Sequence, residues 1–511
     1  MPEDLDDDAV HRVVVVGGGS AGWIAAARIA ARNAVSVVLV ESPNEPAIGV
    51  GEGTWPTMRN TLAKIGLSET DFIRHADAVF KQGARFVGWT FGGEDGYYHP
   101  LNPPAGAGEV NLSPHWETQE GEEPFAHRVD FQGTLCDRGL APKSITHPEY
   151  AGLANYAYHL DAGKFAALLR DHAVGKLGVE HMRGDVVSVD QAENGDIRVL
   201  HLADGRTIPG DLFVDCTGFK GVLIDRVYGV PLRDCRKYLF ADKALALQVP
   251  YANEDAPIVC HTVSTAREAG WIWDIGLWSR RGTGYVYSSA YSTDEQAERT
   301  LRDYIGPAAE KLEARKIGIN SGYREAFWVG NCVSVGLSAG FIEPLEASAL
   351  MLIELAMDSV ADRLPATRSS MQALSRQFND DFHHHWARVI EFLKLHYVLT
   401  RRQEPFWRDN TDAASIPEGL LERLELWRHH PPSAADFPRN REVFSWPSYQ
   451  YVLHGMHFAT RYAVSPSLLQ ERQAATRLFE RVAMLKSDAV TRLPEHRSLI
   501  RAIREHGLQR V

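Results

Sequence analysis

The chain lacks the features that mark membrane-embedded, secreted and nucleic-acid-binding proteins. No apolar run approaches the roughly 20 residues that span a bilayer. The acidic start, "MPEDLDDDAVHR", has neither the basic residues nor the apolar core of a signal peptide. The net charge is -12, whereas binding to phosphates needs a basic surface. We therefore expect a cytoplasmic protein that binds neither a membrane nor nucleic acid.

Cysteine is also scarce. The sequence contains five cysteines, Cys136, Cys216, Cys235, Cys260 and Cys332. An odd number with no CxxC fits free thiols in a reducing compartment better than a disulfide framework or a zinc site. The run "FHHHW" (382–386) does not change this, because consecutive histidines on a helix point in different directions. The sequence predicts no bound metal.

What the sequence does contain begins with a nucleotide-binding pattern. In "HRVVVVGGGSAGWIAAARIAARN" (11–33), Gly17, Gly19 and Gly22 form G-x-G-x-x-G between a β-branched run and an Ala-rich helical segment. A second apolar run, "VSVVLVE", ends in Glu41. Such glycines let backbone N–H groups approach a pyrophosphate at the helix N-terminus, and the acid binds ribose hydroxyls. Strand, helix, strand and acid together predict a dinucleotide site.

Two later segments favour FAD over NAD. In "DGRTIPGDLFVDCTGFKG" (204–221) an apolar strand ends in Asp-Cys-Thr-Gly, although a strand and an ordinary turn explain this segment equally well. In 331–364, an apolar strand, a small-residue turn and Pro344 precede a long amphipathic helix. The free N–H groups and positive dipole end of that helix suit a flavin edge or a bound anion.

The stretch "WIWDIG" (271–276) contains two tryptophans one residue apart. Strand side chains alternate between faces, so both indoles are expected to point the same way. The expected faces are Trp271, Trp273 and Ile275 on one side and Ile272, Asp274 and Gly276 on the other. Core packing explains most isolated aromatic pairs. The alternative is an aromatic wall with a function.

The order of these and other motifs resembles one family, the flavin-dependent tryptophan halogenases. The motifs are "GGGSAGW", "GVGEGTWP" (49–56), "FKQGARFVGW" (80–89), "YYHPL" (97–101), "DLFVDCTGF", "WIWDIGL", "GTGYVYSS" (282–289), "GFIEPLEAS" and "LHYVLTRRQEPFW" (395–407). The resemblance covers residues 17–407. It implies an α/β fold with an FAD-binding Rossmann-type core, as in flavoprotein monooxygenases, an inserted β-sheet and a C-terminal helical layer. We expect the FAD-binding module and inserted sheet in 1–364 and a mostly helical region that covers the substrate in 365–511.

The resemblance implies a two-component enzyme. A separate NAD(P)H-dependent flavin reductase would supply FADH2, which reacts with O2 to a C4a-hydroperoxide that chloride or bromide attacks. The hypohalous acid would pass through a tunnel to Lys81, which presents the halogen to an electron-rich arene. Glu346 would position the oxidant or take the proton of the arenium intermediate. A surface lysine is the alternative for Lys81, but a haloamine route requires burial that lowers its pKa.

The resemblance also assigns the remaining site residues. Trp271 and Trp273 would separate the flavin from the substrate and shield it from water. Backbone N–H groups of Ser348 and Ala349 would bind the halide. The cofactor-binding residues implied are Gly17, Gly19, Ser20, Ala21, Gly22, Glu41, Gly49, Val50, Gly51, Val186 and Leu337.

Departures from the family pattern concern the substrate and the halide. Gly276 replaces a proline, Ala347 a hydroxyl residue and Ala349 a glycine. The substrate-side residues are His99, Leu101, Tyr449 and Tyr451. They lack the Tyr-Tyr pair of tryptophan-specific members, and no acid occurs between 443 and 470 to pair with an amino acid's ammonium.

We therefore expect a small, less polar aromatic substrate such as indole, a substituted indole or a phenol. Aromatic hydroxylation by a flavin monooxygenase is the alternative activity, and a flavin-binding regulatory protein without turnover is a third. A homodimer is compatible with the sequence.

Overall fold

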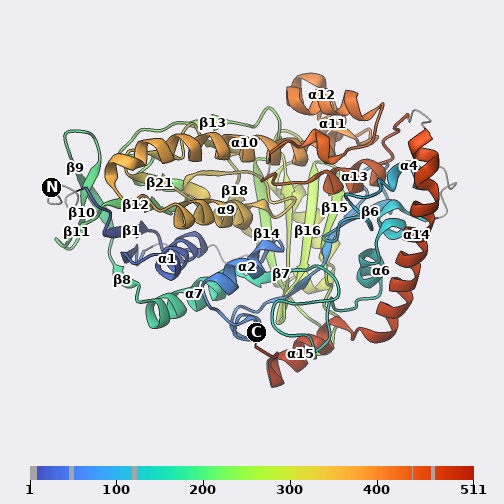
Figure 1. The fold of residues 1–511 in the computed structure, drawn as a ribbon, viewed down its shortest axis with the longest axis horizontal. Coiled ribbons are helices and arrows are strands. Elements are labelled where there is room, and N and C mark those ends of the chain that lie inside the picture. Colours follow the sequence, from blue (N-terminus) through green and yellow to red (C-terminus); the bar gives the residue numbers. More distant parts are fainter. Residues whose placement is uncertain (1–7, 45–50, 118–122, 440, 462–465, 511) are drawn as a thin grey trace. The chain divides into compact units, whose positions relative to one another are not determined.

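The computed structural model describes residues 8–44, 51–117, 123–439, 441–461 and 466–510 (Figure 1). The chain forms two units that alternate along the sequence. The first consists of Met1–Asp77, Leu160–Cys235 and Asn320–Trp386, and the second of Ala78–His159, Arg236–Ile319 and Ala387–Val511. This grouping is spatial, whereas the expected division after residue 364 follows the chain, so that division remains a prediction.

A six-stranded sheet with the order β20-β21-β12-β1-β2-β8 forms the centre of the first unit. All neighbours pair in parallel except β20, which is antiparallel to β21. The strands are β1 (Arg12–Val16), β2 (Ser36–Glu41), β8 (Glu180–Arg183), β12 (Leu212–Asp215), β20 (Trp328–Val329) and β21 (Cys332–Ser334). The valines of β1 are buried without alternation, as a central parallel strand requires.

Helices α1 (Ser20–Arg32), α7 (Ala162–Leu177) and α9 (Ser348–Asp362) accompany this sheet, and α1 lies beside both of the others (Figure 1). The alanines of α1 allow this close approach. Arg28 of α1 is buried and donates to Asp358 of α9 at 2.9 Å, which joins the two helices. Other α-helices and strands of the first unit are β3 (Gly51–Gly53), α2 (Thr57–Lys64), α3 (Glu69–His75), β9 (Val186–Gln191), β10 (Ile197–Leu202), β11 (Thr207–Pro209), β13 (Leu232–Asp234), β19 (Gly322–Arg324) and β22 (Gly340–Phe341).

Helix α9 carries a buried carboxyl group, Glu354, that α2 holds by hydrogen bonds. The hydroxyls of Thr57 and Thr61 donate to it at 3.1 and 2.5 Å. Burial raises the pKa of Glu354 to about 8, against the lowering effect of these hydrogen bonds. The group is therefore mostly protonated at neutral pH.

We expect Glu354→Gln to stabilise the protein at pH 8 but not at pH 5. The carboxyl titrates near 4.5 when unfolded and near 8 when folded, so the native protein loses stability as pH rises between these values. The amide removes that loss, a gain on the order of a few kcal/mol at pH 8. Thermal unfolding at both pH values measures it, with the exposed Glu193→Gln as control. Equal shifts at pH 5 and pH 8 would contradict the assignment.

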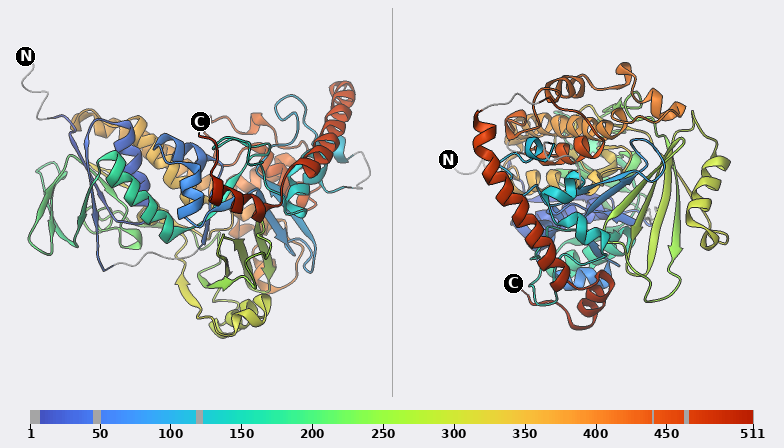
Figure 2. Two further views of the ribbon diagram at one scale, coloured as in Figure 1. Left: turned by 90° about the horizontal axis from the view of Figure 1, so that it is seen from below. Right: turned by 90° about the vertical axis from the view of Figure 1, so that its right-hand side faces the viewer.

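The second unit is built on a seven-stranded sheet with the order β18-β14-β17-β16-β15-β5-β6. Helix α8 (Asp294–Ile305) covers one of its faces, where Ala297 and Leu301 pack against Leu245 and Ile272 (Figure 2). The strands are β5 (Gly83–Val87), β6 (Gly96–Pro100), β14 (Lys243–Pro250), β15 (Thr262–Arg267), β16 (Gly270–Gly276), β17 (Arg280–Tyr287) and β18 (Arg315–Gly318). Apart from this sheet, β4 (Val79–Lys81) pairs antiparallel with β7 (Ala157–Asp161).

Helices make up most of the chain after residue 365. Long helix α14 packs against α5 and α6, and its length is visible in Figure 2. The helices after residue 365 are α10 (Met371–Val398), α11 (Pro405–Asp409), α12 (Glu418–Trp427), α13 (Trp446–Gly455), α14 (Pro466–Arg492) and α15 (His496–His506). Three short helices precede them in the chain, α4 (Ser113–Glu117), α5 (Phe125–Val129) and α6 (Gln132–Asp137). Among the described residues, no helix combines the length and apolar character needed to cross a bilayer. The predicted α/β class, with its parallel Gly-rich core, inserted sheet and C-terminal helices, is confirmed.

Candidate active site

The glycine-rich turn between β1 and α1 has the geometry that its sequence predicts. Gly17 has φ +118°, and a Cβ there would lie 2.1 Å from the carbonyl oxygen of Cys216. A Cβ on Gly22 would lie 1.8 Å from the carbonyl oxygen of Gly17. Only glycine fits at these two positions. Around Gly19, by contrast, no atom of the described residues other than its chain neighbours lies within 4 Å of where a Cβ would stand, so these residues leave open space beside the helix start.

That open space suits the pyrophosphate of a dinucleotide. Gly19 caps α1 without a side-chain hydrogen bond, and the first turn, which includes Ser20 and Ala21, contains no acid. The N–H groups of this turn and the positive helix end therefore favour a bound anion. Glu41, at the end of β2, bonds His181 at 2.8 Å and lies against Gly18, where a Cβ would come within 2.5 Å of the carboxylate. These residues fit FAD.

The other predicted cofactor residues lie in the same unit. A Cβ on Gly336 would stand 2.9 Å from the Cβ of Ala21, so the 3-10 turn that contains Leu337 (Gly336–Ser338) lies against the start of α1. Gly51 begins β3. Val186 begins β9 and packs on the hydrophobic cluster of β1, β2 and β10. Gly49 and Val50 lie outside the described residues.

Glu346 lies just before α9 and is buried, with 6% of its surface exposed. The indole N–H of Trp55 donates to its carbonyl oxygen at 2.8 Å, which fixes the turn. Ala347 then adopts a left-handed conformation (φ 54°) and begins the helix without a side-chain cap. Ser348 is buried, and Ala349 is exposed. The helix thus opens with backbone N–H groups that no cap side chain occupies.

Lys81 ends strand β4 and is buried, with 4% of its surface exposed. A surface position, the alternative raised by the sequence, is therefore wrong. The backbone is held on both sides of the lysine. The N–H of Phe80 donates to His496 Nε2 at 3.1 Å, and the N–H of Gln82 donates to the carbonyl of Cys260 at 2.7 Å.

Two histidines that the sequence did not single out surround this strand. His496 is neutral, because burial lowers its pKa. Its Nε2 accepts from Phe80 and its Nδ1 faces the carbonyl of Ile258 at 3.0 Å, which fixes the proton on Nδ1. Burial also lowers the pKa of His159 well below its ordinary value, and the charge of Lys81 adds to this effect. No local pattern marks either histidine, since His496 lies 416 residues after Phe80.

The paired tryptophans occupy one face of β16, as predicted. Ile272 packs beneath α8, and Tyr304 of α8 donates to Asp274 at 3.3 Å, so these residues share the opposite face. Trp271 is buried, with its ring centroid 6.5 Å from that of Trp273. The ring of Trp273 covers Gly284 of β17, where a Cβ would lie 2.0 Å from the indole. Glycine at position 284 therefore makes room for the second indole.

The four substrate-side residues lie in the second unit but have different neighbours. His99 is buried, with ring centroids 5.6 Å from Phe392 and 6.1 Å from Tyr451. The Tyr451 hydroxyl donates to Asn102 O at 3.1 Å. The backbone of Leu101 is held by Gln132 and Asn155. Tyr449 instead packs in an aromatic cluster with Phe392, Trp427 and Phe437. His99 and Tyr451 are thus neighbours, whereas the two tyrosines on α13 face different sides.

The candidate residues are shared between the units. The glycine-rich turn, Glu41, Glu346 and Ser348 belong to the first unit, and Lys81, both tryptophans and the substrate-side residues belong to the second. The first unit thus offers a dinucleotide cradle and a helix start with a neighbouring carboxyl group. The second offers a buried lysine and aromatic surroundings.

The chain is similar to known proteins over most of its length. The tryptophan halogenase family model matches residues 12–469. The chain is 34% identical to the 7-chloro-L-tryptophan 6-halogenase KtzR of Kutzneria sp. (strain 744), over 95% of this chain and 98% of the relative. A tryptophan halogenase from Shewanella frigidimarina NCIMB 400 is 44% identical, with a TM-score of 0.96 over 98% of this chain and 99% of its own.

Tar14, a tryptophan C-6 flavin-dependent halogenase from taromycin biosynthesis, is 36% identical, with a TM-score of 0.91 over 97% of this chain and 100% of its own. The likeness extends over the glycine-rich core, the inserted sheet and the C-terminal helices alike. The residues matched by the family model, 12–469, include every described candidate residue. The chain therefore belongs to the tryptophan halogenase family and is a flavin-dependent halogenase.

Proposed function

We propose that this enzyme uses FADH2 and O2 to convert chloride or bromide into hypohalous acid, and that Lys81 directs this oxidant onto an electron-rich indole. The observation that carries the proposal is the burial of Lys81 on a strand whose backbone is held at both neighbouring residues. A buried, fixed ammonium can donate hydrogen bonds to a small oxidant without competition from water. Family membership supplies the reaction class.

The first unit holds the cofactor in this proposal. Gly17, Gly19 and Gly22 place the pyrophosphate at the start of α1, and Glu41 takes the ribose hydroxyls. Bound FADH2, delivered by a separate NAD(P)H-dependent flavin reductase, supplies the electrons that activate O2 for oxidation of the halide.

The start of α9 binds the halide in this proposal. The backbone N–H groups of Ser348 and Ala349 point out of an uncapped helix end, and Ala347 turns the chain into that end. Glu346, directly before this turn, accepts the proton that the arene releases when the carbon–halogen bond has formed. Trp271 and Trp273 exclude water and keep the arene from the flavin.

The arene binds beside His99, Leu101 and Tyr451. Relatives are named for tryptophan, but the substrate-side helix α13 has no carboxylate for an amino acid's ammonium. A buried ammonium without such a partner is costly. We therefore assign a less polar indole as the preferred substrate, with Tyr449 contributing to the packing behind Phe392.

A product screen tests this function. The enzyme, a flavin reductase, NADH, FAD and bromide are incubated in air with a panel of tryptophan, indole, substituted indoles and phenols. Mass spectrometry is expected to find singly brominated indoles, recognised by the bromine isotope doublet, with free tryptophan converted less well. Products that carry only a hydroxyl group would overturn the proposal in favour of a monooxygenase. Preferred bromination of tryptophan would overturn the substrate assignment alone.

A further inference from the structure

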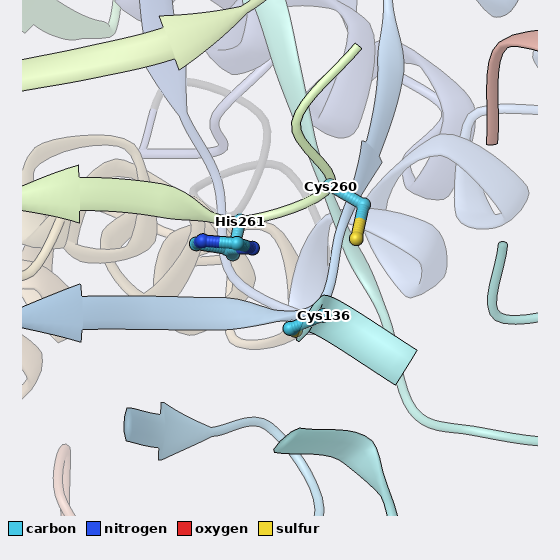
Figure 3. A group of neighbouring side chains, drawn as sticks. All are labelled: Cys136, Cys260 and His261. Carbon is cyan, nitrogen blue, oxygen red and sulfur yellow. The ribbon is translucent and has the colours of Figure 1, made fainter. Parts of the chain in front are cut away.

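Two cysteines and a histidine meet in the interior of the second unit. Cys136 belongs to the last turn of α6, and Cys260 and His261 directly precede β15 (Figure 3). Their sulfur and nitrogen ligand atoms all lie within 4.8 Å of one another. The exposed fractions of the three residues are 6%, 0% and 6%. Cys136 lies more than a hundred positions before Cys260 and His261 in the chain. The cluster of three residues therefore becomes visible only in the folded protein.

The spacing of the three ligand atoms is close to that of a zinc site. Bonds of about 2.3 Å to sulfur and about 2.0 Å to nitrogen place the ligand atoms of tetrahedral zinc roughly 3.5–3.8 Å apart. Atoms within 4.8 Å of one another reach this geometry by shifts of about 1 Å. His261 Nδ1 is buried and has no hydrogen-bond partner among the described residues. A buried nitrogen of this kind is costly unless it binds something.

The charges of the cluster favour a divalent ion. Two thiolates and a neutral imidazole around Zn²⁺ carry no net charge, whereas a monovalent ion would leave a negative charge buried. An uncompensated charge in such an interior is strongly disfavoured.

A hydrogen-bond network centred on Asp137 lies beside the cluster. Tyr98 packs edge-on against the ring of His261, with centroids 5.3 Å apart. Its hydroxyl donates to Asp137 at 2.7 Å, and His127 Nε2 lies 2.8 Å from the other oxygen of that carboxylate. Asp137 directly follows Cys136 in the chain, so this network fixes the end of α6 that carries the first sulfur ligand.

We propose that Cys136, Cys260 and His261 bind one Zn²⁺ ion, with a solvent molecule as the fourth ligand. Buried thiols that only fill space are the alternative, since free cysteine behaves as a small hydrophobe. The site would join α6 to the segment that begins β15. Because the Cys260 carbonyl accepts the N–H of Gln82, the metal would also stabilise the backbone next to Lys81.

Metal titration of the full chain tests the site. Reduced protein freed of metal with a chelator is titrated with Zn²⁺ against a chromophoric chelator, and separately with Co²⁺, whose thiolate charge-transfer bands report sulfur ligands. The wild type is expected to bind one equivalent and to show these bands. Cys260→Ser and His261→Gln are expected to bind Zn²⁺ more than about 100-fold more weakly, beyond the effect of outer-layer changes. Cys332→Ser, at a buried cysteine of the first unit, is the matched control and should bind like the wild type.

The titration has clear opposing outcomes. The Co²⁺ spectrum of the wild type needs no variant, so the test does not depend on whether every variant folds. A wild-type chain that binds Zn²⁺ no better than Cys260→Ser overturns the proposal, whether its thiols are free or joined in a disulfide. Loss of binding in Cys332→Ser as severe as in Cys260→Ser overturns it as well.

Discussion

Lys81→Ala is expected to lower the rate of arene halogenation by about 10²–10³-fold, the usual cost of removing one preorganised donor to a reacting group. Consumption of FADH2 and O2 is expected to continue, because the residues proposed to hold the flavin and the halide belong to the other unit. Product formation is measured by mass spectrometry and oxygen uptake with an electrode, in the same reaction. The variant should therefore separate oxidant formation from its use.

A second buried lysine provides the control. Lys394 is fully buried and donates to Asn410 Oδ1 at 2.7 Å, so Lys394→Ala also removes a buried ammonium from the second unit. We expect it to lower thermal stability while halogenation persists. Wild-type halogenation by Lys81→Ala would remove this lysine from the mechanism. Equal loss in both variants would attribute the effect to misfolding.

Glu346→Gln is expected to reduce the turnover number by about 10²–10⁴-fold, the range for loss of a group that transfers a proton. The amide keeps the size of the side chain but cannot take a proton from the arenium intermediate. Proton removal should then limit the rate, so an indole deuterated at the attacked carbon should react more slowly than the protiated one. Single-turnover product formation with both substrates measures this isotope effect.

Glu354→Gln is the matched control for this experiment. Its carboxyl group is buried on α9, the helix that begins directly after Glu346 and Ala347, and, with a pKa raised to about 8, is mostly protonated at pH 7, so the amide resembles the native state. Turnover should stay near the wild-type rate. If Glu346→Gln shows unchanged turnover and no isotope effect, the proton must leave by another route.

The dinucleotide core could be predicted because its constraints are local. Gly22 is required by its contact with Gly17 in the same strand–turn–helix unit and Gly17 by its φ of +118°, and the motif encodes that geometry directly. The shared face of Trp271 and Trp273 has an equally local cause, because side chains two residues apart on a strand point the same way. In both cases a short stretch of sequence determines where side chains point.

The surroundings of Lys81 could not be predicted, because distant segments supply them. His159 lies on a neighbouring strand and His496 in the last helix, and no motif connects either with Lys81. Sequence proximity was also a poor guide on α13, where Tyr449 packs on Trp427 and Tyr451 on His99 because residues two apart on a helix do not share a face. The same geometry separates the histidines of "FHHHW", since His383 packs on Phe327 and His385 on Phe382.

The hydrogen bond from Phe80 to His496 has a consequence for biosynthesis. At translation rates of about 5–20 residues per second, the 416 positions between these residues take roughly 20–80 s to synthesise. During that interval the lysine-bearing strand lacks one of its backbone partners. Translation products that terminate before position 496 would leave the ribosome with this strand incompletely anchored, so the backbone that carries Lys81 is completed only late in synthesis.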